Sequence, residues 1–138
     1  NGTTILRFNG FEAYDQPTRT SRPVASSTVM TLPVGQIVGM VYVPLEGAPF
    51  VVGGTQQTTD WLVVLTRDTA GYALRALDAN APWTEVASEN GTIEGWGSLF
   101  PLIVDIDFDP VSRLLMLSYD SNGITSGGSI LVTALTPQ

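Results

Sequence analysis

The chain has 138 residues and a net charge of −7, with six arginines but no lysine, histidine or cysteine. The three missing residue types supply most side-chain bases, covalent nucleophiles and nitrogen or sulfur metal ligands. The composition therefore disfavours most enzymes, and we expect a non-enzymatic protein without a cofactor. The acidic balance argues against nucleic-acid binding, and no apolar run approaches the roughly 18 residues of a membrane helix.

Short apolar runs, broken by Gly, Pro and Asn, predict strands along most of the chain. The predicted strands are Thr4–Phe8, Gln36–Val43, Phe50–Gly53, Trp61–Thr66, Tyr72–Leu77, Leu102–Phe108, Arg113–Tyr119 and Ser129–Leu135. We expect one all-β, mostly antiparallel domain over residues 1–138, built as a two-sheet β-sandwich. Sheets like propeller blades are the alternative.

Residues 14–35 differ from the rest, because Pro17, Pro23 and Pro33 punctuate a Ser/Thr-rich stretch without a clear period. Proline removes backbone donors and favours extended chain, so this segment is predicted to be an extended arm or a long loop.

The charge is divided unevenly along the chain. Residues 1–36 hold three arginines and two acids, a net of +1, and residues 37–138 hold three arginines and eleven acids, a net of −8. A mildly cationic arm beside an acidic body could lie on its own body or on that of a neighbour.

Two strands are expected to differ in the number of faces that they bury. Residues 61–65 (WLVVL) are continuously apolar, which predicts burial on both faces. Leu102–Phe108 becomes alternating at its end, where Asp105 and Asp107 share one face, so it should have one dry and one wet side.

A second loop is predicted over Ala79–Leu99, where Trp83 and Trp96 stand among Gly, Pro and Asn. Pro82 could open a single helical turn near Trp83–Ser88.

Two segments echo each other about 66 residues apart: IVGMVYVP at Ile37–Pro44 and IVDIDFDP at Ile103–Pro110. Each begins a unit of strand, Pro turn, strand, loop and strand, and Thr4–Phe8 could supply a fourth strand to the second unit. This order resembles single blades of β-propeller repeat proteins. The resemblance implies four-stranded antiparallel sheets, but two blades cannot close a ring without other chains.

The D-x-D-x-D motif at Asp105–Asp109 begins like a calcium loop. The match then fails, because Pro110 stands at position 6 and Met116 at position 12. The favoured interpretation is that the three aspartates lie on a solvated strand face, where Arg113 balances part of their charge.

Carbohydrate chemistry is the one alternative that the composition leaves open. Trp83, Trp96 and Glu89 could bind glycans, since aromatic rings stack on sugars, although buried loop anchors are the commoner role for such tryptophans. A carboxylate-only glycosidase would use Glu85, Glu89 or Glu94.

Two sites, Asn1-Gly2-Thr3 and Asn90-Gly91-Thr92, fit the N-glycosylation acceptor pattern. In a secreted eukaryotic protein Asn1 and Asn90 would be glycan sites; in a bacterial or phage protein they would be turns.

The leading functional prediction is a structural or assembly subunit of a virion, filament or cell-surface assembly, located on the virion or outside the cell. Charged residues make up only 14% of the chain, and such a surface suits a protein embedded among neighbours. Its partners would be copies of itself or other subunits, joined through strand edges and the arm. The predicted assembly residues are Ile5, Leu6, Phe8, Pro17, Arg19, Arg22 and Pro23. A carbohydrate-binding module is the alternative.

Overall fold

The computed structural model describes residues 3–8, 14–15, 20–21, 26–32, 35–68, 71–90, 102–120 and 129–133, and every regular element among them is a strand. None of these residues belongs to a helix that could cross a membrane. The strands are β1 (Thr4–Phe8), β2 (Tyr14–Asp15), β3 (Thr20–Ser21), β4 (Ser26–Thr31), β5 (Gln36–Val43), β6 (Val51–Val52), β7 (Thr55–Gln56), β8 (Trp61–Arg67), β9 (Tyr72–Asp78), β10 (Glu85–Asn90), β11 (Leu102–Asp109), β12 (Leu114–Asp120) and β13 (Ser129–Thr133).

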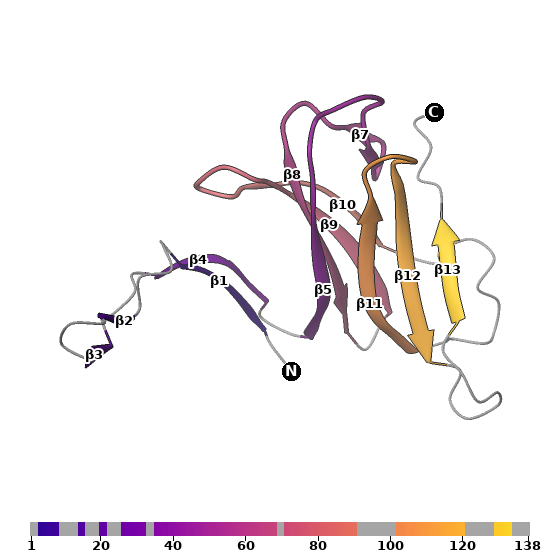
Figure 1. Cartoon of the computed structure of the whole chain (residues 1–138). Coiled ribbons are helices and arrows are strands. Elements are labelled where there is room, and N and C mark those ends of the chain that lie inside the picture. Colours follow the sequence, from indigo (N-terminus) through magenta and orange to yellow (C-terminus); the bar gives the residue numbers. More distant parts are fainter. Residues whose placement is uncertain are drawn as a thin grey trace.

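Two sheets form a β-sandwich-like body (Figure 1). One has four strands in the order β10-β9-β8-β5, and the other has three in the order β11-β12-β13. Three two-stranded ladders, β1-β4, β2-β3 and β6-β7, complete the described structure. Every described pairing is antiparallel, so the predicted fold class is confirmed.

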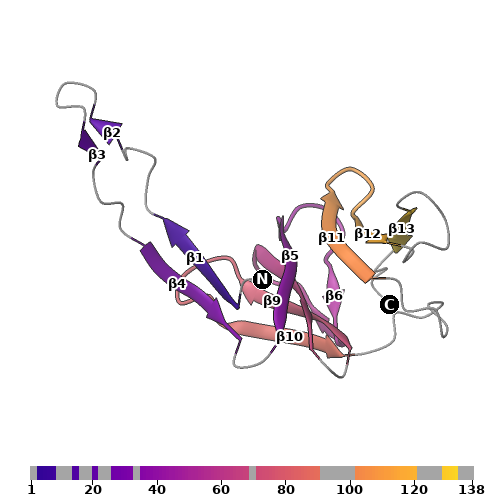
Figure 2. The ribbon, with the colours of Figure 1, turned by 90° about the horizontal axis from the view of Figure 1, so that it is seen from below.

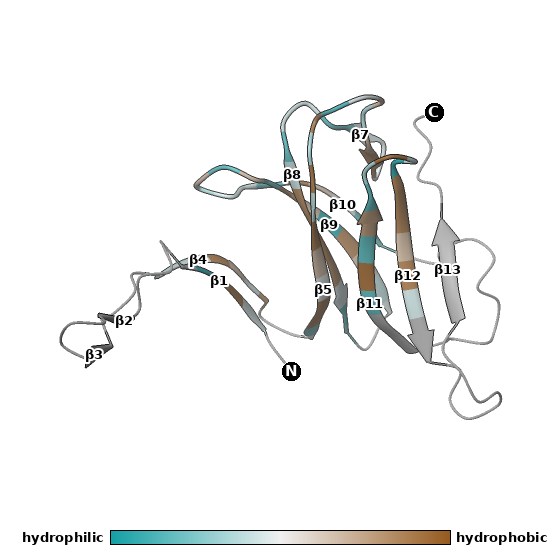
Figure 3. Cartoon of the chain, in the orientation of Figure 1, coloured by the Kyte–Doolittle hydropathy of each residue, from teal (hydrophilic) through white to brown (hydrophobic). Residues whose placement is uncertain are grey.

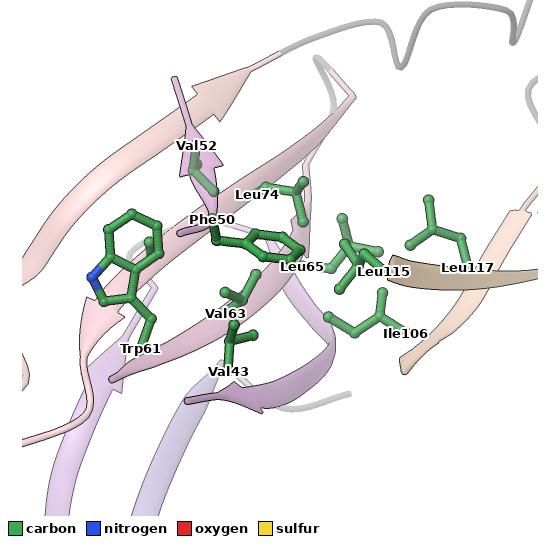
Figure 4. Close-up of a cluster of buried hydrophobic side chains, with 11 residues drawn as sticks. Val43, Phe50, Val52, Trp61, Val63, Leu65, Leu74, Ile106, Leu115 and Leu117 are labelled. Carbon is green, nitrogen blue, oxygen red and sulfur yellow. The ribbon is translucent and has the colours of Figure 1, made fainter. Parts of the chain in front are cut away.

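The main core fills the space between the two sheets, where side chains from both meet (Figure 4). Its buried members are Val43, Phe50, Val52, Trp61, Val63, Leu65, Leu74, Ala76, Ile106, Leu115 and Leu117. Along β11 the hydropathy alternates (Figure 3), with Ile106 buried in this core and Asp105 and Asp107 exposed. The predicted wet and dry sides of this strand are therefore confirmed for the described side chains.

Strand β8 is buried on both faces, as its continuous apolar sequence predicts. Trp61, Val63 and Leu65 enter the main core, whereas Val64 belongs to a second cluster on the opposite face of the same sheet. The second cluster also holds Ile5 of β1. The β1-β4 hairpin thus covers part of what we call the outer face of the four-stranded sheet.

The two sheets approach each other most closely where β5 lies beside β11. A Cβ placed on Gly39 would lie 3.0 Å from an Asp105 carboxylate oxygen and 3.3 Å from the Ile106 backbone nitrogen. Glycine at this position of β5 therefore permits the close approach that closes one side of the sandwich.

Val52 of the short β6-β7 ladder, and Phe50 just before it, enter the main core. The turn of this ladder lies against the edge strand β10, because a Cβ on Gly53 would be only 2.2 Å from the Ser88 carbonyl oxygen. Gly53 also has a φ of 55°, a conformation that side chains with a Cβ rarely adopt.

Gln57 connects three segments around this insertion. Its amide donates to the Val43 carbonyl (2.8 Å), and its side-chain oxygen accepts from the Phe50 backbone N–H (3.3 Å) and from Arg113 (3.2 Å). Arg113 also donates to the Pro44 carbonyl, and its guanidinium lies over the rings of Phe50 and Phe108. A buried amide that satisfies three partners in this way fixes the loop between β5 and β8 to the β11-β12 turn.

We expect Gln57→Leu to lower the free energy of unfolding by about 2–4 kcal/mol, because it leaves buried donors and acceptors unpaired at about 1–3 kcal/mol each. The neighbouring Gln56→Leu is the matched control, since Gln56 is exposed, and it should change stability by less than about 0.5 kcal/mol. Urea denaturation followed by far-UV circular dichroism measures both. Equal effects would contradict the linking role of Gln57.

All eight predicted strands exist with small shifts of their ends, but three finer expectations are wrong. No helical turn forms at Trp83–Ser88, because Glu85–Asn90 pairs with β9 as a strand. Thr4–Phe8 does not complete the second sheet, since it pairs with Ser26–Thr31. The second strand of the first echoed unit, β6, pairs with β7 and does not join the sheet of β5 and β8.

Candidate functional site

The first part of the candidate site projects from the sandwich (Figures 1 and 2). From here on we call it the arm; it runs from β1 to β4, residues 4–31, and begins with the β1-β4 hairpin. Its ladder runs from Thr4 opposite Thr31 to Phe8 opposite Ser26, with a bulge between Ile5 and Leu6. The short β2-β3 ladder lies beyond the far end of this hairpin, away from β5. Within the predicted arm of residues 14–35, the described residues include the paired strands β2 and β3 and the strand β4, which pairs with β1.

The structure gives different environments to the predicted assembly residues of β1. Ile5 is buried in the second cluster, so it fastens the hairpin to its own chain. Leu6 is 46% exposed and free to contact another molecule. The Arg7 guanidinium lies 5.7 Å from the ring centre of Trp83, a cation–π contact that adds to the attachment.

Five of the predicted assembly positions lie where the structure does not describe a side chain. They are Phe8, Pro17, Arg19, Arg22 and Pro23.

The second part of the candidate site is an exposed patch on the outer face, beside the area that the hairpin covers. We call it the Tyr42 patch; it consists of Met40, Tyr42, Leu45, Glu46 and Asp60. Tyr42 is 54% exposed, Met40 50% and Leu45 41%. Large apolar side chains gathered at one place on a surface are typical of contact sites.

A hydrogen-bonded carboxylate organises the Tyr42 patch. Asp60 accepts the Leu45 backbone N–H at 2.8 Å and the Tyr42 hydroxyl. Donation by the Leu45 N–H, and secondly by Tyr42, stabilises the ionised carboxylate and lowers the pKa of Asp60. The same bond to Asp60 raises the pKa of Tyr42 above its ordinary value, and the negative charges of Asp60 and Glu46 add to this.

The body offers no free arginine to these two acids. Arg67 donates to Gln36, Arg75 binds Glu85, and Arg113 donates to Pro44 and Gln57. Among the residues that the structure describes, no ion pair involves Glu46 or Asp60. The patch therefore presents negative charge beside apolar surface.

We expect Tyr42→Phe to raise the pKa of Asp60 only part of the way to its ordinary value, because the stronger contribution of the Leu45 N–H remains. Since the folded-state pKa is depressed, this interaction stabilises the fold above the unfolded-state pKa of Asp60 and is lost as pH falls through the folded-state value. Carboxyl ¹³C NMR titration of both proteins measures the difference. An unchanged pKa in Tyr42→Phe would show that the hydroxyl does not stabilise the carboxylate.

Of the predicted glycan-binding residues, the structure describes Trp83 and Glu89, and it does not bring these two together. Trp83 packs against the second cluster on the outer face, whereas the Glu89 carboxylate accepts the Gly53 N–H at the β6-β7 turn. Glu85 forms an ion pair with Arg75 at 3.2 Å. Trp96, Glu94 and Asn1 lie outside the described residues, and Asn90 is exposed at the end of β10.

The acidic strand face of β11 binds its own backbone. Asp105 and Asp107 each accept the N–H of the following residue, and Asp109 accepts from Val111 and Ser112. In the described part of the chain, no three or more His, Cys, Asp or Glu side chains are arranged to hold a metal ion. The expected countercharge is wrong, because Arg113 turns toward Phe50 and Phe108 instead.

The Tyr42 patch is the feature that the sequence patterns did not identify. Its strand reads GMVYV, so no alternation of polar and apolar residues distinguishes the exposed face from the buried one. No protein-family model matches this chain, and no curated protein or solved structure is similar enough to count as a match.

Proposed function

We propose that this chain is a non-enzymatic structural subunit that self-associates through its projecting arm. The observation that carries the proposal is the division of the arm into an attached base and a distal end. Ile5 and the contact of Arg7 with Trp83 hold the base on the chain's own outer face. The β2-β3 ladder lies away from that face, so the distal end is available to another molecule.

The surface of the body supports the same function. The large side chains of Leu6, Met40 and Tyr42 are exposed. Leu6 lies on the hairpin, and Met40 and Tyr42 lie on the outer face of the four-stranded sheet. Both β1 and β4 also have a second edge that pairs with no other described strand. Unpaired strand edges and exposed apolar groups are the usual means by which β-proteins associate.

Light scattering of the full chain over a range of concentrations tests this function. The proposal requires a mass that is a multiple of 14.7 kDa and that grows or saturates with concentration. A protein that remains at 14.7 kDa throughout that range would refute self-association. A virion, a filament or a cell-surface layer would each be a suitable setting for such a subunit.

A further inference from the structure

We propose that the Tyr42 patch binds the distal end of the arm of a second copy of this chain. This inference rests on the proposed self-association and names the two surfaces that meet. One surface is the Tyr42 patch. The other is the segment of residues 16–25, QPTRTSRPVA, which we call the arm tip.

The charges of the two surfaces are complementary. The Tyr42 patch carries the carboxylates of Glu46 and Asp60, and no described cation forms an ion pair with either. The arm tip has Arg19 and Arg22 and no acidic residue. Guanidinium groups pair well with carboxylates because they offer several donors in a planar array.

The apolar chemistry is complementary too. Pro17 and Pro23 stand beside the two arginines of the arm tip, and the patch offers the exposed side chains of Met40 and Tyr42. Extended proline-containing segments are commonly recognised on exposed aromatic rings, since such segments lose little conformational entropy when they bind. Arginine side chains also stack on aromatic faces.

The arrangement of the arm identifies a second copy as the partner. Strands β2 and β3, which flank residues 16–19, lie beyond the far end of the β1-β4 hairpin (Figures 1 and 2). The Tyr42 patch lies on the C-terminal half of β5, on the loop that follows it and on the residue just before β8, so it belongs to the sandwich itself. The described strands β2 and β3 therefore lie away from the sandwich of their own chain, which favours the patch of a neighbouring copy as the binding site.

Charge reversal on each surface tests this pairing. The arm variant is Arg19→Glu/Arg22→Glu, and the patch variant is Met40→Arg/Glu46→Arg, which leaves the hydrogen bonds of Asp60 intact. Each variant alone should self-associate at least about tenfold more weakly than the wild type. An equimolar mixture of the two variants should recover association, because opposite charges then face each other again. Sedimentation velocity measures all four samples.

The outcomes separate this inference from the function on which it rests. If the wild type associates and the patch variant associates equally well, the arm tip binds elsewhere and the inference is wrong, although self-association stands. If the wild type does not associate at any concentration, both are wrong. Far-UV circular dichroism of the two variants verifies that they are folded. We expect the patch variant to fold because both of its substituted positions, Met40 and Glu46, are exposed.

Discussion

Replacing Phe50 by alanine should lower the free energy of unfolding by about 3–5 kcal/mol, the usual cost of removing a buried aromatic ring. Phe50 is 1% exposed and lies in the main core between the two sheets. Its ring meets that of Phe108 edge to face at 5.6 Å, and the Arg113 guanidinium lies 5.9 Å from its centre. The substitution removes both ring contacts and leaves a cavity.

Urea denaturation followed by far-UV circular dichroism measures this loss. The control is Val111→Ala in the β11-β12 turn, since Val111 is 91% exposed; it should change stability by less than about 0.5 kcal/mol. If Phe50→Ala costs less than about 1 kcal/mol, the loop that carries this ring is not part of the core.

Val64→Asp should cost more than about 4 kcal/mol, or prevent folding altogether, because it buries an unpaired carboxylate. Val64 is fully buried on the outer face of β8, in the cluster that includes Ile5 of the hairpin. The prediction therefore tests whether the arm covers this face in solution.

Met40→Asp is the matched control for Val64→Asp. Met40 is the cross-strand partner of Val64, and it is exposed. In dilute solution this control should cost no more than about 1 kcal/mol. Should Val64→Asp fail to fold, Val64→Ala gives a measurable loss of about 2 kcal/mol. Equal small losses for Val64→Asp and Met40→Asp would contradict the covering role of the hairpin.

The strands that build the sandwich could be predicted from sequence because they carry a strong local signal. β8 is continuously apolar, and the burial of Trp61 and Val64 on its opposite faces explains why. The end of β11 alternates, and Ile106 accordingly points inward while Asp107 is exposed. In both strands the pattern of apolar residues indicates whether one face or both faces are buried.

The strands that the sequence patterns missed lack such a signal. β10 reads EVASEN, and five of its six side chains are exposed, so only its pairing with β9 makes it a strand. β4 reads SSTVMT within a proline-containing stretch, and its structure depends on partners in β1 that are 18 to 27 positions away. Pairing between segments distant in sequence cannot be recognised from either segment alone.

The candidate site was only partly predictable for a similar reason. Proline spacing and charge indicated an arm over residues 14–35, but the position of Ile5 in the chain's own cluster depends on tertiary packing. The bond between Tyr42 and Asp60 joins residues 18 positions apart. Arg113 has a φ of 58° in its turn and binds Gln57, 56 positions away. None of these contacts can be recognised from the pattern of residues around either partner.

The proposed self-association depends on the distal end of the arm, which binds the sandwich of a neighbouring copy. Deleting residues 11–25 tests it, because Asn9-Gly10 would then connect Phe8 to its ladder partner Ser26, and Asn-Gly is the preferred two-residue hairpin turn. The hairpin keeps its cover over Val64. By sedimentation velocity the full chain should form oligomers and the deletion variant should be a folded monomer. Oligomers of the same size and affinity from both proteins would contradict the claim.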